Sequence, residues 1–345
     1  MTRSGLAALA AATAIAVPGA AGCNLNKLAA DQTIGVLALA EPSFEREDDI
    51  GLAEAGIFAN LKLFEGLMEV SPKNRTVYYL SAQAFGSYAF GFLDPKIESM
   101  NDPTDPTRKV LVARAISFYT RGRTYAEKWM AFKVKDISAK LHGDLPTAKA
   151  TLAALDKKMV PGLFWCGYNW AQLINAKVDV MDEPVAGGAA AAASDDGDVS
   201  ATPPPAPAKG SGGGLVLAEF DSAKAVMERV AALDETFFNA SPHTILGVMA
   251  GARPVSLGGD PKEAAMHFDK AIELTHHKFL LPIVFKAQFW ATNVGDRAAF
   301  EALLKEALAA PDDLYPEQRL ANELAKMRAA MLLKQADTLF VDAGK

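Results

Sequence analysis

Apolar residues recur along most of this chain at the three- and four-residue spacing of a buried helix face. The pattern is clear between residues 49 and 182, for example at Leu61, Phe64, Leu67 and Met68. No stretch alternates apolar and polar residues for long enough to indicate a β-strand. The spacing therefore predicts an all-α protein.

Signals for helix starts and ends recur with the apolar pattern. Ser71-Pro72 and Asp260-Pro261 each place a capping side chain before a proline, which fits the first helical position because it has no N–H to satisfy. Similar endings, as at Asp234 and Thr275, are spaced by about forty residues, which is typical of helical repeats. We therefore expect an irregular helix-turn-helix array, that is, a superhelical α-solenoid.

One segment, residues 183–214, departs from this pattern. It is rich in Ala, Pro and Gly, and Val185 and Val199 are its sizeable apolar side chains. Such a stretch cannot bury enough surface to offset its ordering entropy. We predict a disordered insert that separates helical pairs at 49–182 from helical pairs at 215–345 within one helical-repeat domain.

The N-terminus has the features of an export signal. Gly5–Val17 is apolar but too short for a permanent membrane span, so residues 1–22 are predicted to be a signal peptide. A small-small-Gly-Cys sequence then ends at Cys23, which we predict to be the lipid attachment site; simple secretion is the alternative. Residues 23–48 are interpreted as a lipid-anchored tether that could include a helix at Lys27–Leu39.

These features predict a periplasmic, membrane-anchored lipoprotein. Asn24 is not the Asp that retains lipoproteins at the inner membrane, which favours the outer membrane. The formal net charge of −6 and the lack of a basic stripe argue against a nucleic-acid partner.

Motifs for catalysis or cofactor binding are missing from the sequence. It contains no Gly-rich phosphate loop, no His-Glu-x-x-His and no Gly-x-Ser-x-Gly, so we predict no enzymatic activity and no cofactor. A metal site at His267, His276 and His277 is not favoured, because His267 is expected to face outward and His276-His277 to end a helix. Cys166 is expected to be a buried thiol beside aromatic neighbours.

Aromatic residues cluster in two places, between residues 164 and 170 and at residues 289–290. Side chains at helical spacing usually belong to a core, but an apolar groove between helices is the alternative. The candidate lining residues of such a ligand pocket are Trp165, Tyr168, Trp170, Phe289 and Trp290.

Several phrases occur together in an order that extends over most of the chain. They are Cys23-Asn24-Leu25, Asn60–Leu67, Ser71–Asn74, Gly86–Phe92, Arg121–Ala126, Phe164–Ala171, His243–Gly247, Leu257–Pro261 and Asp296–Phe300. In this arrangement the chain resembles the T-component (TatT) lipoproteins associated with tripartite ATP-independent periplasmic (TRAP) transporters. The Ala/Pro/Gly insert departs from the family's compact pattern.

The resemblance implies tetratricopeptide-like helix pairs and an adaptor that docks the transporter's solute-binding subunit. It also implies a possible homo-oligomer, such as a trimer, that carries an apolar small molecule, and it supplies no catalytic residues. The alternative function is that of a lipoprotein that serves as a general scaffold in the cell envelope and binds other proteins.

Overall fold

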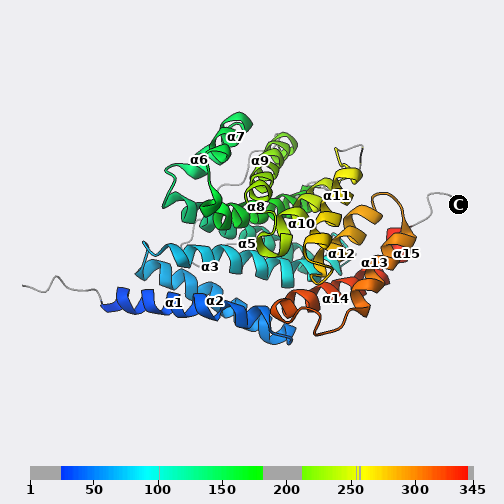
Figure 1. The fold of residues 1–345 in the computed structure, drawn as a ribbon, viewed down its shortest axis with the longest axis horizontal. Helices are drawn as coiled ribbons and strands as arrows, with labels where there is room; N and C mark the ends of the chain where they lie inside the picture. Colours follow the sequence, from blue (N-terminus) through cyan, green and yellow to red (C-terminus); the bar gives the residue numbers. More distant parts are fainter. Residues whose placement is uncertain (1–24, 101, 182–211, 254, 256–257, 341–345) are drawn as a thin grey trace, which may run out of the picture.

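The computed structural model describes residues 25–100, 102–181, 212–253, 255 and 258–340. All the regular structure within them is helical (Figure 1), which confirms the predicted all-α class. The stacking of helix pairs into a tetratricopeptide-like solenoid stays a prediction. The signal peptide, Cys23 and residues 183–211 of the predicted insert lie outside the described residues.

The helices before the insert follow one another with short connections. They are α1 (Leu25–Glu45), α2 (Ile50–Val70), α3 (Arg75–Tyr88), the π-helical turn η1 (Ala89–Leu93), α4 (Asp94–Glu98), α5 (Pro106–Ala131), α6 (Ile137–Leu141), α7 (Leu145–Ala153), the 3₁₀ turn η2 (Lys157–Met159) and α8 (Val160–Met181).

The helices after the insert complete the fold. They are α9 (Gly212–Leu233), α10 (Phe237–Gly251), α11 (Pro261–Leu274), α12 (Leu281–Phe285), the π-helical turn η4 (Lys286–Ala291), α13 (Arg297–Ala309), the 3₁₀ turn η5 (Pro316–Gln318), α14 (Arg319–Lys334) and α15 (Ala336–Leu339).

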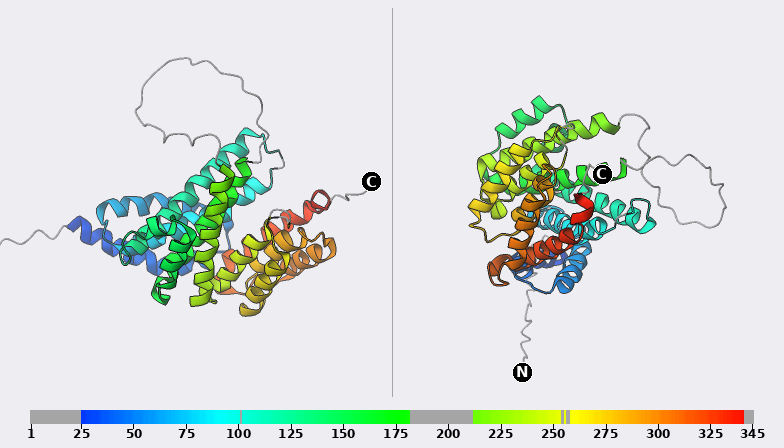
Figure 2. Two further views of the ribbon diagram at one scale, coloured as in Figure 1. Left: turned by 90° about the horizontal axis from the view of Figure 1, so that it is seen from above. Right: turned by 90° about the vertical axis from the view of Figure 1, so that its right-hand side faces the viewer.

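Helices that are close in sequence pack on one another along the molecule. α3 contacts α2 and α5, α8 contacts α5 and α9, and α10 contacts α11. As a result, α13 and α15 lie at the opposite end of the molecule from the start of α1 (Figures 1 and 2). After α13 the chain returns to α1, where η5 lies, and α14 starts beside α1 and α2 and runs out to α15, so the two halves of the chain meet.

Side-chain caps begin several of these helices. Asp260 Oδ1 accepts hydrogen bonds from the backbone N–H groups of Lys262 and Glu263, at 2.9 and 3.0 Å, as the sequence predicts. The prediction for Ser71 is wrong. Asn74 caps α3 instead, because its side chain accepts from the N–H of Thr76 at 3.0 Å.

Residues 25–45, within the segment interpreted as a tether, form α1, which is packed into the fold. Ala30 and Ile34 are buried, and Asp31 accepts hydrogen bonds from the Ser71 hydroxyl and the Asn74 amide at 2.5 and 2.8 Å. At the other boundary, α9 begins at Gly212 rather than at residue 215.

A close contact between three helices surrounds Asn169 of α8, whose side chain is fully buried. Its amide nitrogen donates to the carbonyl oxygens of Ala82 and Trp165, at 3.1 and 2.7 Å. Gly86 of α3 and Gly122 of α5 face this amide with no side chain of their own. The glycines therefore allow α3, α5 and α8 to pack tightly.

Candidate functional site

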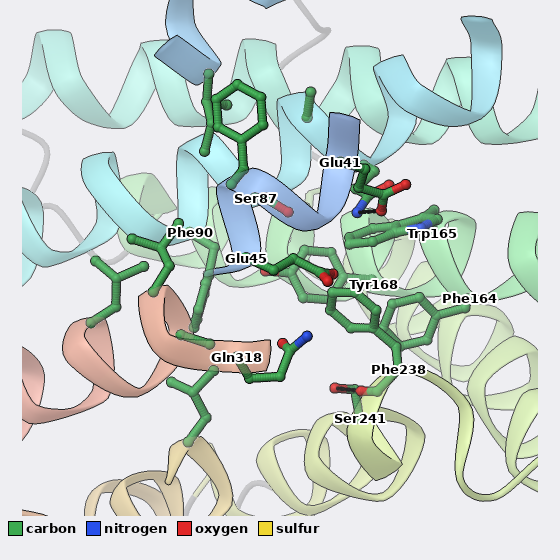
Figure 3. Close-up of a pocket in the computed structure, with 18 of the residues that line it drawn as sticks. Glu41, Glu45, Ser87, Phe90, Phe164, Trp165, Tyr168, Phe238, Ser241 and Gln318 are labelled. Atoms are coloured by element: carbon green, nitrogen blue, oxygen red, sulfur yellow. Dashed lines mark hydrogen bonds between the residues drawn. The ribbon is translucent and has the colours of Figure 1, made fainter. Parts of the chain in front are cut away.

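A cavity of about 200 Å³ lies where the two halves of the chain meet. Helices α1, α2, α3, α8, α10, α12 and α14 and the turns η1 and η5 all contribute to its wall. Figure 3 shows the acidic side chains of α1 on one side of the cavity and aromatic rings of α8 opposite them. Sites for drug-sized ligands have volumes of about 300–1,000 Å³, so this cavity suits a small ligand or part of a longer one.

Aromatic rings form much of the wall. Trp165 is 1% exposed and Tyr168 is 8% exposed, and their rings meet edge to face with centroids 5.3 Å apart. Phe238 of α10 contacts the Trp165 ring with centroids 5.2 Å apart, and Phe164 lies beside both. These rings give the cavity a rigid apolar surface.

A left-handed turn places Phe238 at this wall. Phe238, Asn239 and Ala240 have φ angles of 46°, 57° and 55°, which non-glycine residues rarely adopt. The Tyr315 hydroxyl donates to Asn239 Oδ1 at 2.9 Å and stabilises the turn. Strained backbone of this kind often lies at binding sites.

Two carboxylates are the charged groups of the cavity wall. Glu41 and Glu45 are one turn apart on α1, and the Gln83 amide donates to Glu41. Burial raises the pKa of Glu41. Burial and the charge of Glu41 raise the pKa of Glu45, although a hydrogen bond with Gln318 opposes this shift.

Comparison with known proteins identifies the family of the chain that forms this cavity. A family model for the TRAP transporter T-component matches residues 46–190 and 211–340, which is most of the chain. The chain belongs to the TRAP transporter T-component family. It is also similar to an uncharacterized protein of Treponema pallidum (strain Nichols), at 22% identity over 343 residues covering 93% of this chain and 94% of the relative.

Membership makes this T-component an envelope-associated protein that works with a TRAP transporter. Among the helices that the structure describes, none is long and apolar enough to cross a membrane. Within the described part of the chain, no three His, Cys, Asp or Glu side chains gather in a way that could hold a metal ion.

Two of the five predicted lining residues of the T-component line the cavity, and three do not. Trp165 and Tyr168 do. Trp170 lies five residues after Trp165, about 140° around the helix, and packs instead against His142 with ring centroids 4.4 Å apart. Phe289 and Trp290 are on η4 and do not line the cavity; Phe289 packs against Phe285 with ring centroids 5.6 Å apart, and Trp290 lies against the same buried cluster.

The contribution of α1 to the cavity was not predicted. Leu37, Glu41, Phe44 and Glu45 all line it. Their spacing of four, three and one residues places them on one helix face, but apolar residues also lie on the exposed side of α1, so the sequence does not single this face out.

The histidines lie elsewhere in the T-component. His267 does not face outward as predicted, because its Nδ1 is 2.9 Å from Nδ1 of His243 on α10, and its side chain is 12% exposed. Glu235 lies 3.5 Å from His243 Nε2, and Glu263 lies 3.9 Å from His267 Nε2. A single hydrogen bond between the two Nδ1 atoms requires at least one neutral imidazole.

This pair makes stability depend on pH. Burial and the neighbouring His243 lower the pKa of His267 from 6.5 to about 4. Below pH 6.5 His267 therefore binds a proton in the unfolded chain, whereas in the folded chain it binds one only near pH 4. The free energy of unfolding therefore decreases as the pH falls from about 6.5 to about 4. We expect a loss of about 2 kcal/mol, less than the full shift would give because water partly reaches both rings.

The measurement is urea unfolding at pH 7 and pH 4.5, compared with a His267→Gln variant. The variant should lose less stability over this interval than the natural chain. Equal losses in the two proteins would show that the pair is not responsible.

The predictions for three other residues are confirmed. His276 and His277 follow the end of α11, with φ angles of 52° and 60°, and the N–H of His277 donates to the carbonyl oxygen of Ile272 at 3.0 Å. Cys166 is fully buried, and burial raises the pKa of its thiol. Buried thiols of this kind are inert.

Proposed function

We propose that this chain is a periplasmic adaptor that docks the solute-binding subunit of a TRAP transporter and holds an apolar ligand in its central cavity. Family membership supports the association with the transporter. The observation that supports ligand carriage is the cavity itself, whose wall combines ten aromatic side chains with eight polar ones among the described residues. Ligand sites in proteins have this composition.

We further propose that acyl chains on Cys23 hold the adaptor at the membrane. Two or more chains anchor a protein stably, because burial contributes about 0.8 kcal/mol per CH₂ group. Cys23 is two residues before α1, which begins at Leu25. An anchor at this position would tie the start of α1 to the lipid surface, about 18 Å along the helix from its first cavity-lining residue, Leu37.

Docking is tested by mixing the purified chain with the solute-binding protein of the same TRAP transporter and measuring association by analytical ultracentrifugation. We expect a complex, whereas a periplasmic binding protein of another transporter class should not associate. The absence of a complex at high micromolar concentrations would contradict the docking proposal. Association with both binding proteins would favour a general envelope scaffold.

A further inference from the structure

The charged side chains that line the cavity are all acidic among the described residues. Of the side chains that line it among the described residues, Glu41 and Glu45 are acidic, and none is Lys, Arg or His. The other polar side chains of the wall are neutral, for example Gln83, Ser241 and Gln318. An anionic ligand would therefore meet repulsion without a compensating cation.

The two carboxylates lack a positively charged partner inside the cavity. No ion pair recorded among the described residues includes Glu41 or Glu45, and the nearby Arg46 is the smallest of the influences on the pKa of Glu45. Burial raises the pKa of both groups, so the surrounding fold disfavours their charged forms. A cation in the cavity would reverse this effect, because an opposite charge at short range favours the ionised carboxylate.

The wall also offers a hydrogen-bond acceptor. Oε1 of Gln83 is buried and has no hydrogen-bond partner among the described residues, while the amide nitrogen of the same side chain donates to Glu41. A buried acceptor without a partner costs free energy. An N–H group of a ligand beside Glu41 would supply the missing donor.

Aromatic rings lie near the carboxylates. Trp165 and Tyr168 lie opposite α1 (Figure 3), and rings of this kind attract cations through their faces. One protein cation is already near the wall: Arg328 lies 4.8 Å from the centre of the Phe90 ring. It does not line the cavity and is paired with Glu98 at 3.1 Å, so its charge is compensated.

We propose that the cavity selects an amphipathic organic cation, a small apolar chain or ring that carries a protonated amine. The ammonium group lies between Glu41, Glu45 and Gln83, and the apolar part lies against Trp165 and Tyr168. This inference rests on the proposed ligand carriage and names the chemical class of the ligand.

The test uses three probes with the same alkyl chain and different head groups: n-octylamine, 1-octanol and octanoate. Their binding to the purified protein is measured at pH 7 by isothermal titration calorimetry and by tryptophan fluorescence. We expect the Kd of octylamine to be about tenfold lower than that of octanol, because hydrogen bonds to charged groups are worth more than neutral ones. Octanoate should bind most weakly.

A Glu41→Gln, Glu45→Gln double variant should lose the preference for octylamine over octanol and should bind octanoate better. The matched control is the Glu69→Gln, Glu228→Gln variant, which removes the same charge from exposed positions away from the cavity and should keep the preference. If the double variant folds poorly, the single Glu45→Gln variant should show an intermediate preference.

The outcomes separate the two proposals. Equal affinity for the three probes, or tightest binding of octanoate, would overturn the selection of cations and leave an apolar ligand site in place. Failure of all three probes to bind would overturn both the inference and ligand carriage.

Discussion

Replacing Glu98 with alanine is expected to lower the free energy of unfolding by about 3 kcal/mol. The side chain of Arg328 on α14 is 4% exposed, and its Nε and Nη2 atoms lie 3.1 and 3.2 Å from the Glu98 carboxylate of α4. Without Glu98, a buried guanidinium would remain among the rings of Phe90 and Phe285 without its carboxylate. Urea unfolding followed by circular dichroism measures the change.

An Arg328→Met variant is the control. It removes the buried charge and keeps an apolar side chain of similar length, while the partly exposed Glu98 can still be hydrated. Its loss should be about 1 kcal/mol or less, since replacing a buried charge with an apolar group is often neutral. A loss in Arg328→Met as large as that in Glu98→Ala would show that packing, rather than charge, holds α14 against α4.

The second large effect is expected for Gly122→Ala in α5, a loss of about 2–3 kcal/mol. A β-carbon at this position would be 2.6 Å from Cγ and 2.8 Å from Nδ2 of Asn169. Asn169 cannot easily move away, because it is buried and would lose its hydrogen bonds to Ala82 and Trp165. The added methyl group must therefore push α5 and α8 apart.

Gly66→Ala in α2 is the matched control for this prediction. It is the same substitution in a helix, but a β-carbon at Gly66 has no atom within 4 Å. Alanine should stabilise this helix by up to about 1 kcal/mol, because glycine is the poorer helix former. Thermal unfolding of the two variants should therefore shift in opposite directions, and shifts of the same sign would contradict the explanation.

Much of the local structure could be predicted because its causes are local. The spacing of Leu61, Phe64 and Leu67 gave the buried face of α2, and Asp260 gave the start of α11. Both signals depend on residues within one or two turns of a helix.

The role of α1 was hidden by its composition. Its outer side also carries apolar residues, since Leu28, Val36 and Leu39 are exposed, so apolar residues are spread around the helix and its inner face does not stand out. The cavity could not be predicted for a different reason. Glu41, Trp165 and Phe238 are distant in sequence, and their meeting depends on helix packing that no local pattern records.

The packing of α14 on α1 also determines when the cavity can form. Leu37 and Glu41 line it from the beginning of the described chain, and Leu320 and Leu324 line it from near the end. The wall therefore stays incomplete until α14 has packed on α1, whichever helices fold first. The proposed ligand would therefore find its complete site only in molecules whose N- and C-terminal helices have packed together.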